Sequence, residues 1–397
     1  MEPREPIELP VEHLPNSDEP AFVRTFEFRF GGSPVVPPPV PRQLRPRVFL
    51  PLLLFLTTCV TTFMIGGSMF GKQIVVQHLV ENDGRIEVQL RLEADWTSPE
   101  TPLAGARYSF ALMAILLAHE MGHFLQARRY GVPASWPWFI PIPALPMGTM
   151  GAVIVQASGF ADRKQLFDIG ISGPLAGLVL ALPITIFGLQ DSHVIDIANQ
   201  GGGLSFGNPL ILRWLAEWRF GPLAAGEDVV LTPLLYAGWV GIFVTALNLI
   251  PIGQLDGGHI LYCLIGRKAH WVARGLLWFA IGFMIVTQNW SYIVMVVLLL
   301  MMGSRHPPSR DDSVPLGRCR EVLGWLTLSF IVIGFTPMPI SIDERPPAKK
   351  PAEQKAEPLF VGQWQVRCVA CEDFWIVTPT GSVSEGERFT RLRCEQS

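Results

Sequence analysis

The chain has 397 residues, of which 49% are hydrophobic and only 16% are charged, and its mean hydropathy is +0.33. This balance excludes a disordered chain and indicates an integral membrane protein. The formal net charge is −3 and the sequence has no basic block, which argues against nucleic acid as a partner. Six cysteines in a chain of this length do not form a disulfide framework.

Residues 1–47 are polar and rich in proline, and we expect a flexible tail that acts as a spacer or binds a partner domain. The uncharged segment from Val48 to Gly71 is long enough to span a bilayer, which takes about 20 helical residues. Arginines precede this segment, so the positive-inside rule places the N-terminus in the cytoplasm. Residues 72–107 are then external, and the stretches 73–80 and 85–92 fit amphipathic strands or interfacial helices equally well.

The next predicted span, Tyr108 to Ala127, returns to the cytoplasm and contains the sequence HEMGH. His119 and His123 are four residues apart, so they share one face of a helix and can bind one zinc ion. Glu120 lies beside them and can take a proton from water. Such a cluster is costly in an apolar helix unless it has partners, which makes it a candidate functional site. A pair of interior histidines that hydrogen-bond to neighbouring helices is the alternative.

Residues 133–158 are apolar but crowded with proline and glycine, which prevents a straight helix. Irregular backbone at membrane depth must be buried in protein or line a water-filled cavity. We therefore expect a re-entrant loop or a strand hairpin near the histidines, with residues 151–156 as an edge strand for a peptide. A surface loop on the lipid headgroups is the alternative.

The third and fourth spans are predicted at Ile169–Leu189 and Val229–Leu255, on either side of an external loop. Small residues in the third span allow close helix packing, and packing alone can explain them. The fourth span delivers Asp256 to the cytoplasmic side, where charge counting also places the two histidines. An isolated carboxylate there needs a cation, so Asp256 is the candidate third metal ligand; a helix-end carboxylate in water is the alternative. We interpret His259 as an interfacial polar residue.

Gly275 to Ser304 is uncharged and longer than one span requires. A hairpin of two short spans keeps the positive clusters that flank it on one side of the membrane, whereas a single span would separate them. Val322 to Ile340 is the last predicted span. The predicted fold is therefore an α-helical polytopic membrane protein with about seven transmembrane helices, a re-entrant or β-hairpin segment near the active site, and an external C-terminus.

Residues 341–358 form a predicted linker, and residues 359–397 a small β-rich appendage without an assigned role. The appendage has three thiols, one short of a four-cysteine zinc site, and a disulfide can form if it is external. These thiols belong to Cys368, Cys371 and Cys394.

Three motifs together resemble the site-2 protease family of intramembrane zinc metalloproteases. They are HEMGH in an apolar helix, GISGPLAG at residues 170–177, and the pattern N-x-x-P-x-x-x-x-D-G-G from Asn248 to Gly258. MGTMGA at residues 147–152 resembles the corresponding turn of members without a PDZ domain. The resemblance covers roughly Arg107 to Gly266, as the catalytic core of a membrane-embedded domain at residues 48–340.

The resemblance implies that His119, His123 and Asp256 bind one zinc ion per chain and that Glu120 is the general base. It also implies that Asn248 holds the substrate peptide or its oxyanion. The candidate substrate-binding residues in these motifs are Asn248, Gly151, Gly173 and Pro174.

The expected function is hydrolysis of peptide bonds in membrane proteins that carry a transmembrane helix, within or near the bilayer, as in regulated intramembrane proteolysis. The expected site lies towards the cytoplasmic side of this multi-pass protein. A membrane adaptor that keeps the metal as a staple and a zinc transporter are the alternatives. Glu120 argues against a purely structural site, and one compact polar cluster argues against a transporter. The sequence leaves the substrate, the trigger and the oligomeric state open.

Overall fold

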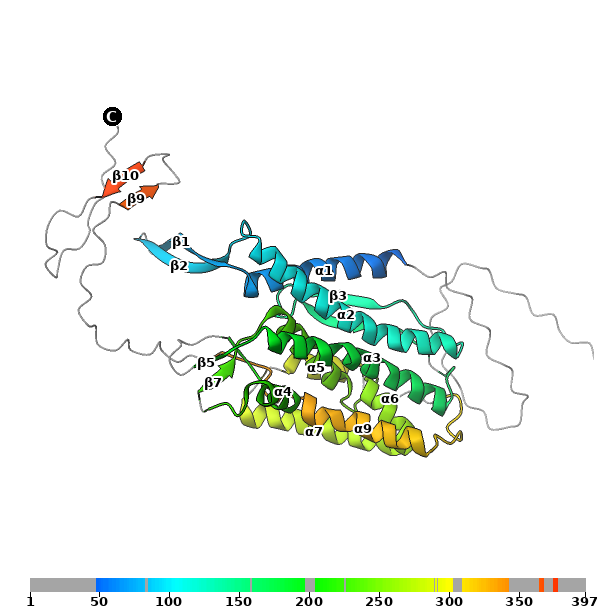
Figure 1. Cartoon of the computed structure of the whole chain (residues 1–397). Helices are drawn as coiled ribbons and strands as arrows, with labels where there is room; N and C mark the ends of the chain where they lie inside the picture. The colour runs from blue at the N-terminus through cyan, green and yellow to red at the C-terminus, as the bar shows by residue number, and fades with distance from the viewer. Residues whose placement is uncertain are drawn as a thin grey trace, which may run out of the picture. The chain divides into compact units, whose positions relative to one another are not determined.

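The computed structural model describes residues 48–82, 85–157, 159–196, 204–224, 226–288, 290, 292–302, 309–342, 364–367 and 374–377. The predicted N-terminal tail, nearly all of the linker and most of the C-terminal appendage lie outside these residues, as do the three thiols of the appendage. The described part is mostly helical (Figure 1).

Five helices build the centre of the bundle. Helix α2 (Glu100–Arg129) packs against α1 (Phe49–Phe70) on one side and α3 (Arg163–Gln190) on the other. Helix α5 (Pro233–Asn248) contacts both α2 and α3, and α6 (Asp256–Ile265) follows it after a short loop and packs against α3 (Figure 1). The helices that carry the sequence motifs are therefore neighbours in space.

Four further helices lie around this centre. They are α4 (Leu210–Phe220), α7 (Ala269–Thr287), α8 (Ile293–Met302) and α9 (Arg318–Gly334), and a 3₁₀ turn, η1 (Gly266–Lys268), joins α6 to α7. Helix α9 contacts α3, α4, α5 and α6, whereas α7 contacts α6 and α8.

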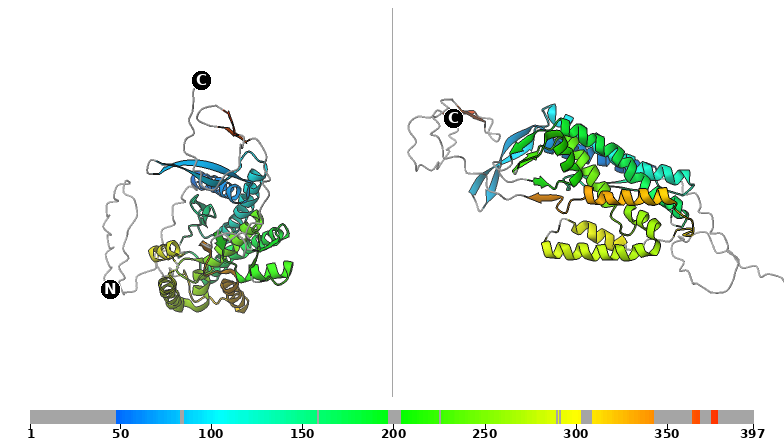
Figure 2. Two further views of the ribbon diagram at one scale, coloured as in Figure 1. Left: turned by 90° about the vertical axis from the view of Figure 1, so that its left-hand side faces the viewer. Right: turned by 60° about the horizontal axis from the view of Figure 1, so that its bottom comes forward.

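The described strands form antiparallel pairs. The hairpin of β1 and β2 extends away from the ends of α1 and α2 (Figures 1 and 2). The pairs are β1 (Gln73–Asn82) with β2 (Arg85–Ala94), β3 (Trp138–Pro141) with β4 (Thr149–Val153), β5 (Val194–Asp196) with β7 (Glu227–Val229), β6 (Leu204–Phe206) with β8 (Ile340–Ile342), and β9 (Trp364–Arg367) with β10 (Phe374–Val377).

Local side-chain chemistry fixes where the central helices begin. Asp162 caps α3, because its carboxylate accepts a hydrogen bond from the Gln165 backbone N–H at 2.8 Å, and the Gln165 side chain accepts one from the Asp162 N–H. Thr232 caps α5 through its hydroxyl, and Pro233 occupies the first helical turn, where no backbone N–H is needed. Both starts are readable from the sequence.

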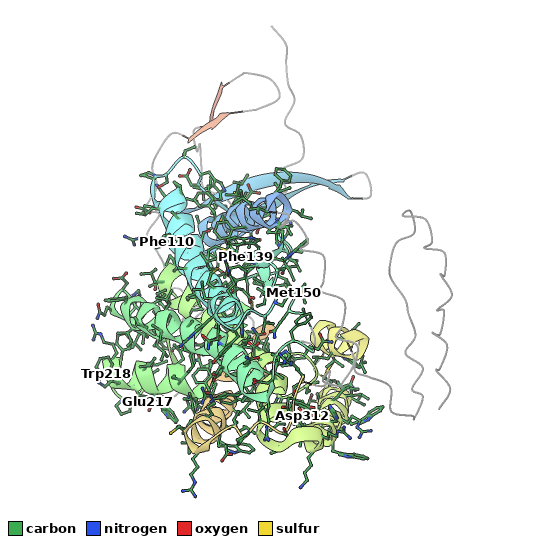
Figure 3. All side chains as sticks on the ribbon, turned by 90° about the vertical axis from the view of Figure 1, so that its right-hand side faces the viewer. Phe110, Phe139, Met150, Glu217, Trp218 and Asp312 are labelled. Atoms are coloured by element: carbon green, nitrogen blue, oxygen red, sulfur yellow. The ribbon has the colours of Figure 1, made fainter. Side chains whose placement is uncertain are left out.

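Aromatic residues fill the core between α2 and α5. The rings of Tyr108 and Tyr236 are stacked with centroids 5.3 Å apart, and Trp239 stacks on Tyr236 at 5.8 Å. Phe139 of β3 is buried next to Phe55 of α1, so the β3–β4 hairpin is part of this core (Figure 3). The expected strand hairpin in residues 133–158 is therefore present, while its re-entrant position in the membrane stays a prediction.

Four helical segments in the described residues have the length and composition to cross a membrane: Phe49–Phe70, Glu100–Arg129, Arg163–Gln190 and Asp256–Thr287. The first lies within the first predicted span, and the second and third contain the second and third predicted spans. The fourth predicted span is represented by the shorter apolar helix α5 and the loop that follows it. Between α7 and α8 the helix stops at Gln288, which has a φ of 54°, so residues 275–304 are not one continuous helix. The total of seven spans stays a prediction.

Segments that charge counting assigns to one side of the membrane meet at one end of the bundle. The Arg163 N–H donates to the Asp311 carbonyl at 3.1 Å, and the Arg163 Nε donates to the Cys263 carbonyl at 2.7 Å. The hydroxyl of Tyr262 donates to Asp312 at 2.8 Å. The loops before α3, after α6 and before α9 are thus joined, although the side they face stays a prediction.

Gly188 tests the close packing of α3 on α5. A Cβ at this position would overlap the backbone of Leu235, which a helix cannot move cheaply. We expect Gly188→Ala to lower the free energy of unfolding by about 1–3 kcal/mol, seen as a lower melting temperature in detergent. Gly275→Ala on α7 is the matched control, because no heavy atom lies within 4 Å of its added Cβ. Equal melting temperatures for the two variants would contradict this packing.

Candidate metal centre

The HEMGH motif lies in the second half of α2, in the interior of the bundle. His119, Glu120 and His123 are 4%, 5% and 5% exposed, although all three are polar. A helix places the two histidines one turn apart on the same face, which here is turned towards α3 and α6. Burial of this kind requires a partner for each polar atom.

Asp256, the first residue of α6, is the partner of the two histidines. Its Oδ2 lies 3.1 Å from His119 Nε2, and its Oδ1 lies 3.2 Å from His123 Nε2. The two Nε2 atoms are 3.2 Å from each other. Among the described residues, these three form the one group of acidic, histidine or cysteine side chains that can share a metal ion.

The backbone fixes the protonation of His123. Its Nδ1 lies 2.7 Å from the carbonyl of Ile169, and a carbonyl only accepts, so the proton sits on Nδ1. The lone pair of Nε2 therefore points at a carboxylate, which is also an acceptor. Two acceptors 3.2 Å apart in an apolar interior repel each other unless a positive charge lies between them. That charge is a metal ion or an additional proton.

The donor set fits zinc. Catalytic zinc sites commonly have three protein ligands, with histidine nitrogens and carboxylate oxygens as frequent donors, and leave a fourth position open. Ligand atoms arranged tetrahedrally at zinc distances lie about 3.3 Å from one another. The three separations here are 3.1, 3.2 and 3.2 Å. The assignment of these residues as zinc ligands remains a prediction that this geometry supports.

Glycines in α3 make room for the imidazoles. A Cβ on Gly173 would overlap the His123 ring, and a Cβ on Gly177 would come within 3.2 Å of His119 Nδ1. A Cβ on Gly122 of the HEMGH motif would lie 2.5 Å from the carbonyl oxygen of Ser172. The small-residue motif in the third predicted span therefore forms the wall behind the histidines. Gly173 and its neighbour Pro174 are buried in this wall, and substrate binding by either stays a prediction.

The loop between α5 and α6 carries the remaining site residues. Asn248 ends α5, and its Nδ2 lies 3.3 Å from His119 Nε2, so its side chain reaches the same cluster. Gly257 and Gly258 let the loop fold against itself, because a Cβ on either would overlap backbone atoms of residues 249–253. This turn aims Asp256 back towards α2. The role of Asn248 in substrate binding stays a prediction.

The β3–β4 hairpin is attached to α1 and α2 by side chains that donate to its backbone. The hydroxyl of Tyr108 donates to the Met147 carbonyl, and that of Thr61 donates to the Gly148 carbonyl, each at 2.8 Å. Gly151 lies in β4 with a φ of 102°, a value that favours glycine. Its predicted contact with substrate is untested, and no described contact joins it to the histidines.

Two structural features were not recognised in the sequence. The carbonyl of Ile169, which orients His123, cannot be identified from a side-chain pattern. Asp168 accepts hydrogen bonds from Arg320 at 2.7 and 2.9 Å and from the Tyr130 hydroxyl at 2.6 Å, which ties α2, α3 and α9 together. Burial and the bond to Asp168 raise the pKa of Tyr130, so its hydroxyl keeps its proton, and with it the hydrogen bond to Asp168, at ordinary pH. A carboxylate near the start of an apolar predicted helix was the available signal in the sequence.

Comparison with known proteins gives a family for this arrangement. Residues 107–287 match peptidase family M50, a range that includes α3, α5, α6 and the HEMGH part of α2. This part of the chain is therefore similar to peptidase family M50. The matched range holds every candidate site residue, including Asp256 and Asn248.

The chain is similar to plant proteins named as probable chloroplastic zinc metalloproteases. It is 29% identical to EGY1 of Arabidopsis thaliana over 72% of this chain and 52% of that protein. It is 28% identical to EGY2 of Arabidopsis thaliana over 57% of this chain and 41% of that protein. The chain therefore spans about half the length of the curated relatives it matches.

A solved site-2 protease from Methanocaldococcus jannaschii is 19% identical, with a TM-score of 0.31, over 50% of this chain and 76% of that chain. A score of this size is too low to compare the two arrangements of helices.

Metal content tests the cluster of two histidines and Asp256. We expect the purified chain to bind about one zinc ion, and His123→Ala and Asp256→Ala to lose or weaken that binding, because each removes one of three donors. Elemental analysis after dialysis against a weak chelator measures the ratio. His193→Ala is the control, since His193 is exposed and distant in sequence from the motif. If wild-type protein stays free of zinc after reloading, the zinc site is contradicted, and an additional proton is the positive charge between His123 and Asp256.

Gly173→Ala separates packing from substrate contact. Because the added Cβ would overlap the His123 ring, we expect a loss of zinc binding with little change in helical content by circular dichroism. Gly282→Ala on α7 has no heavy atom within 4 Å of its Cβ and serves as the control. If Gly173 instead acts only by touching substrate, Gly173→Ala will retain zinc as well as the control does.

Proposed function

We propose that the chain is a zinc metalloendopeptidase that hydrolyses peptide bonds of membrane proteins within or near the bilayer. One observation carries the proposal: two buried histidines and Asp256 converge on one point, with Glu120 buried beside them, in a membrane-length helix. The match to peptidase family M50 and the names of the plant relatives support the same activity.

Each residue of the cluster has a distinct role in this proposal. Zinc bound by His119, His123 and Asp256 supplies Lewis-acid polarisation of a carbonyl and makes water more acidic. Glu120 takes the proton from the attacking water and then gives it to the leaving amine. The Asn248 amide, 3.3 Å from His119 Nε2, is close enough to donate to the oxyanion that forms.

The substrate must present extended backbone, because helical backbone is shielded by its own hydrogen bonds. Strand β4 pairs with β3 on one edge, and Met150 and Val153 on it are 37% and 50% exposed. We propose that its other edge accepts the unwound substrate segment as an additional strand. Substrates are then membrane proteins whose transmembrane helix contains helix-weakening residues near the cut.

The same proposal includes the placement of the site. Arg128 and Arg129 end α2, about one and a half turns after His123, and the joined loops of Arg163, Cys263 and Asp311 lie at that end of the bundle. Under the positive-inside rule this end is cytoplasmic, so water reaches the site from the cytoplasm. The membrane-length helices support a multi-pass membrane protein.

The two rival functions are weaker on the same evidence. An adaptor that uses the metal as a staple has no use for a carboxylate such as Glu120, buried beside the donors. A zinc transporter needs polar groups along a path through several helices. In the part of the chain that the structure describes, one compact donor cluster is present instead.

Glu120→Gln separates the base from the metal site. We expect it to keep its zinc and to lower cleavage by a factor of about 10²–10⁴, the usual contribution of a general base. The measurement uses proteoliposomes that contain the protein and a library of single-span membrane proteins, with fragments read by mass spectrometry. Glu100→Gln, an exposed carboxylate in the first turn of the same helix, is the matched control.

Three outcomes of this experiment contradict parts of the proposal. Normal cleavage by Glu120→Gln would remove Glu120 from the mechanism. Zinc-loaded wild-type protein that cuts nothing in the library favours the adaptor. Zinc flux across the same proteoliposomes favours the transporter.

A further inference from the structure

Helix α4 leaves two large aromatic side chains uncovered. Its buried face, formed by Leu212 and Ala216, packs on α3 and α9. On a second face lie Leu210, Trp214 and Trp218, spaced four residues apart and 37%, 54% and 73% exposed. Indole rings exposed to water in this way forfeit much of the free energy that burial of their apolar surface would give.

The third face of α4 is polar. Arg213 and Glu217 line a cavity of about 350 Å³ together with Glu227 and Asp228 of strand β7. The tryptophan face adjoins this polar face, because Glu217 and Trp218 are consecutive residues about 100° apart around the helix (both are labelled in Figure 3).

The position of α4 matches the boundary of a membrane. The helix lies across the long helices rather than along them: it is seen nearly end-on in Figure 1 and from the side in the left view of Figure 2. Just before it, Gly207 accepts a hydrogen bond from Trp239 at 2.7 Å and donates to Pro339 at 3.0 Å, beyond the end of α9. Helix α4 is thus held at the end of the bundle opposite to Arg163 and Arg320.

Large apolar side chains are also exposed on α3, the helix that α4 packs against. On the neighbouring helix α3, Val179 and Phe187 are 69% and 57% exposed, as expected of side chains that face lipid tails. Phe187 belongs to the last turn of α3, next to the end where α4 packs.

We propose that α4 is an interfacial helix that binds the phospholipids of one leaflet through its tryptophan face. Trp214 and Trp218 lie at the boundary between headgroups and acyl chains, where an indole is apolar on its face and donates a hydrogen bond from its N–H. Arg219, which is exposed in the last turn, can pair with a lipid phosphate. A helix across the bundle, with an exposed apolar face beside an exposed charged face, suits a layered lipid surface better than a compact protein partner.

A fluorescent label at two adjacent positions tests this proposal. The environment-sensitive dye NBD is attached at Trp218→Cys, or at Glu217→Cys as the matched control, with Cys319 and the three cysteines of residues 359–397 replaced by serine. The labelled full chain is placed in phosphatidylcholine–phosphatidylglycerol vesicles. Some vesicles contain phospholipid with a nitroxide near the carbonyl end of its acyl chain, and iodide is the aqueous quencher. Melting temperatures confirm that the labelled variants fold.

We expect the label at position 218 to be quenched by the lipid nitroxide about threefold more than the label at 217, and by iodide less, because the two residues face lipid and water respectively. Equal iodide quenching at both positions, with no effect of the lipid nitroxide, would overturn the proposal. A label at 218 that neither quencher reaches would also overturn it, since a protein partner or a second copy then covers the tryptophans.

Discussion

The contact of His123 with Asp256 is the constraint on which the rest of the structure depends. The proton of His123 is held by the Ile169 carbonyl, so its free lone pair meets a carboxylate oxygen at 3.2 Å. In water such a contact would be screened. Between apolar helices the repulsion is large, because the carboxylate of Asp256 is not hydrated there. The surrounding helices therefore hold a group of donor atoms that needs a positive charge, from a metal ion or an additional proton, to complete it.

The close approach of the α2 and α3 backbones makes this group of donor atoms possible. Helices in a membrane gain little from the hydrophobic effect when they associate, so their packing relies on contact between small residues. Gly122 on α2 and Gly173 on α3 bring the two helices near enough for the His123 ring to reach the Ile169 carbonyl. The histidines therefore depend on the small-residue motif for their position, because bulkier residues there would hold α2 and α3 further apart.

The sequence was most informative where residue type and spacing determine geometry. HEMGH predicted a shared helix face, and the glycines around Asp256 predicted a turn back into the bundle; the structure places the three side chains together, while their roles await measurement. The segments 73–80 and 85–92 fitted amphipathic strands and interfacial helices equally well in the sequence, and their antiparallel pairing in the structure identifies them as strands. The bond of Arg320 to Asp168 joins residues that no local pattern relates. The sequence did not settle the number of spans. The uncharged segment is long enough for one long helix or two short ones, and its length alone does not show that the chain breaks between α7 and α8.

The attachment of the β3–β4 hairpin has a consequence for how the protein can diverge. Tyr108 and Thr61 donate to carbonyls of residues 147 and 148, and a carbonyl is present whatever side chain the residue carries. Side chains along the hairpin can therefore be exchanged without loosening its anchor. Under the proposed binding of a peptide to β4, the residues that would set selectivity differ from those that hold the hairpin in place, so related proteins can acquire new preferences while α1 and α2 remain unchanged.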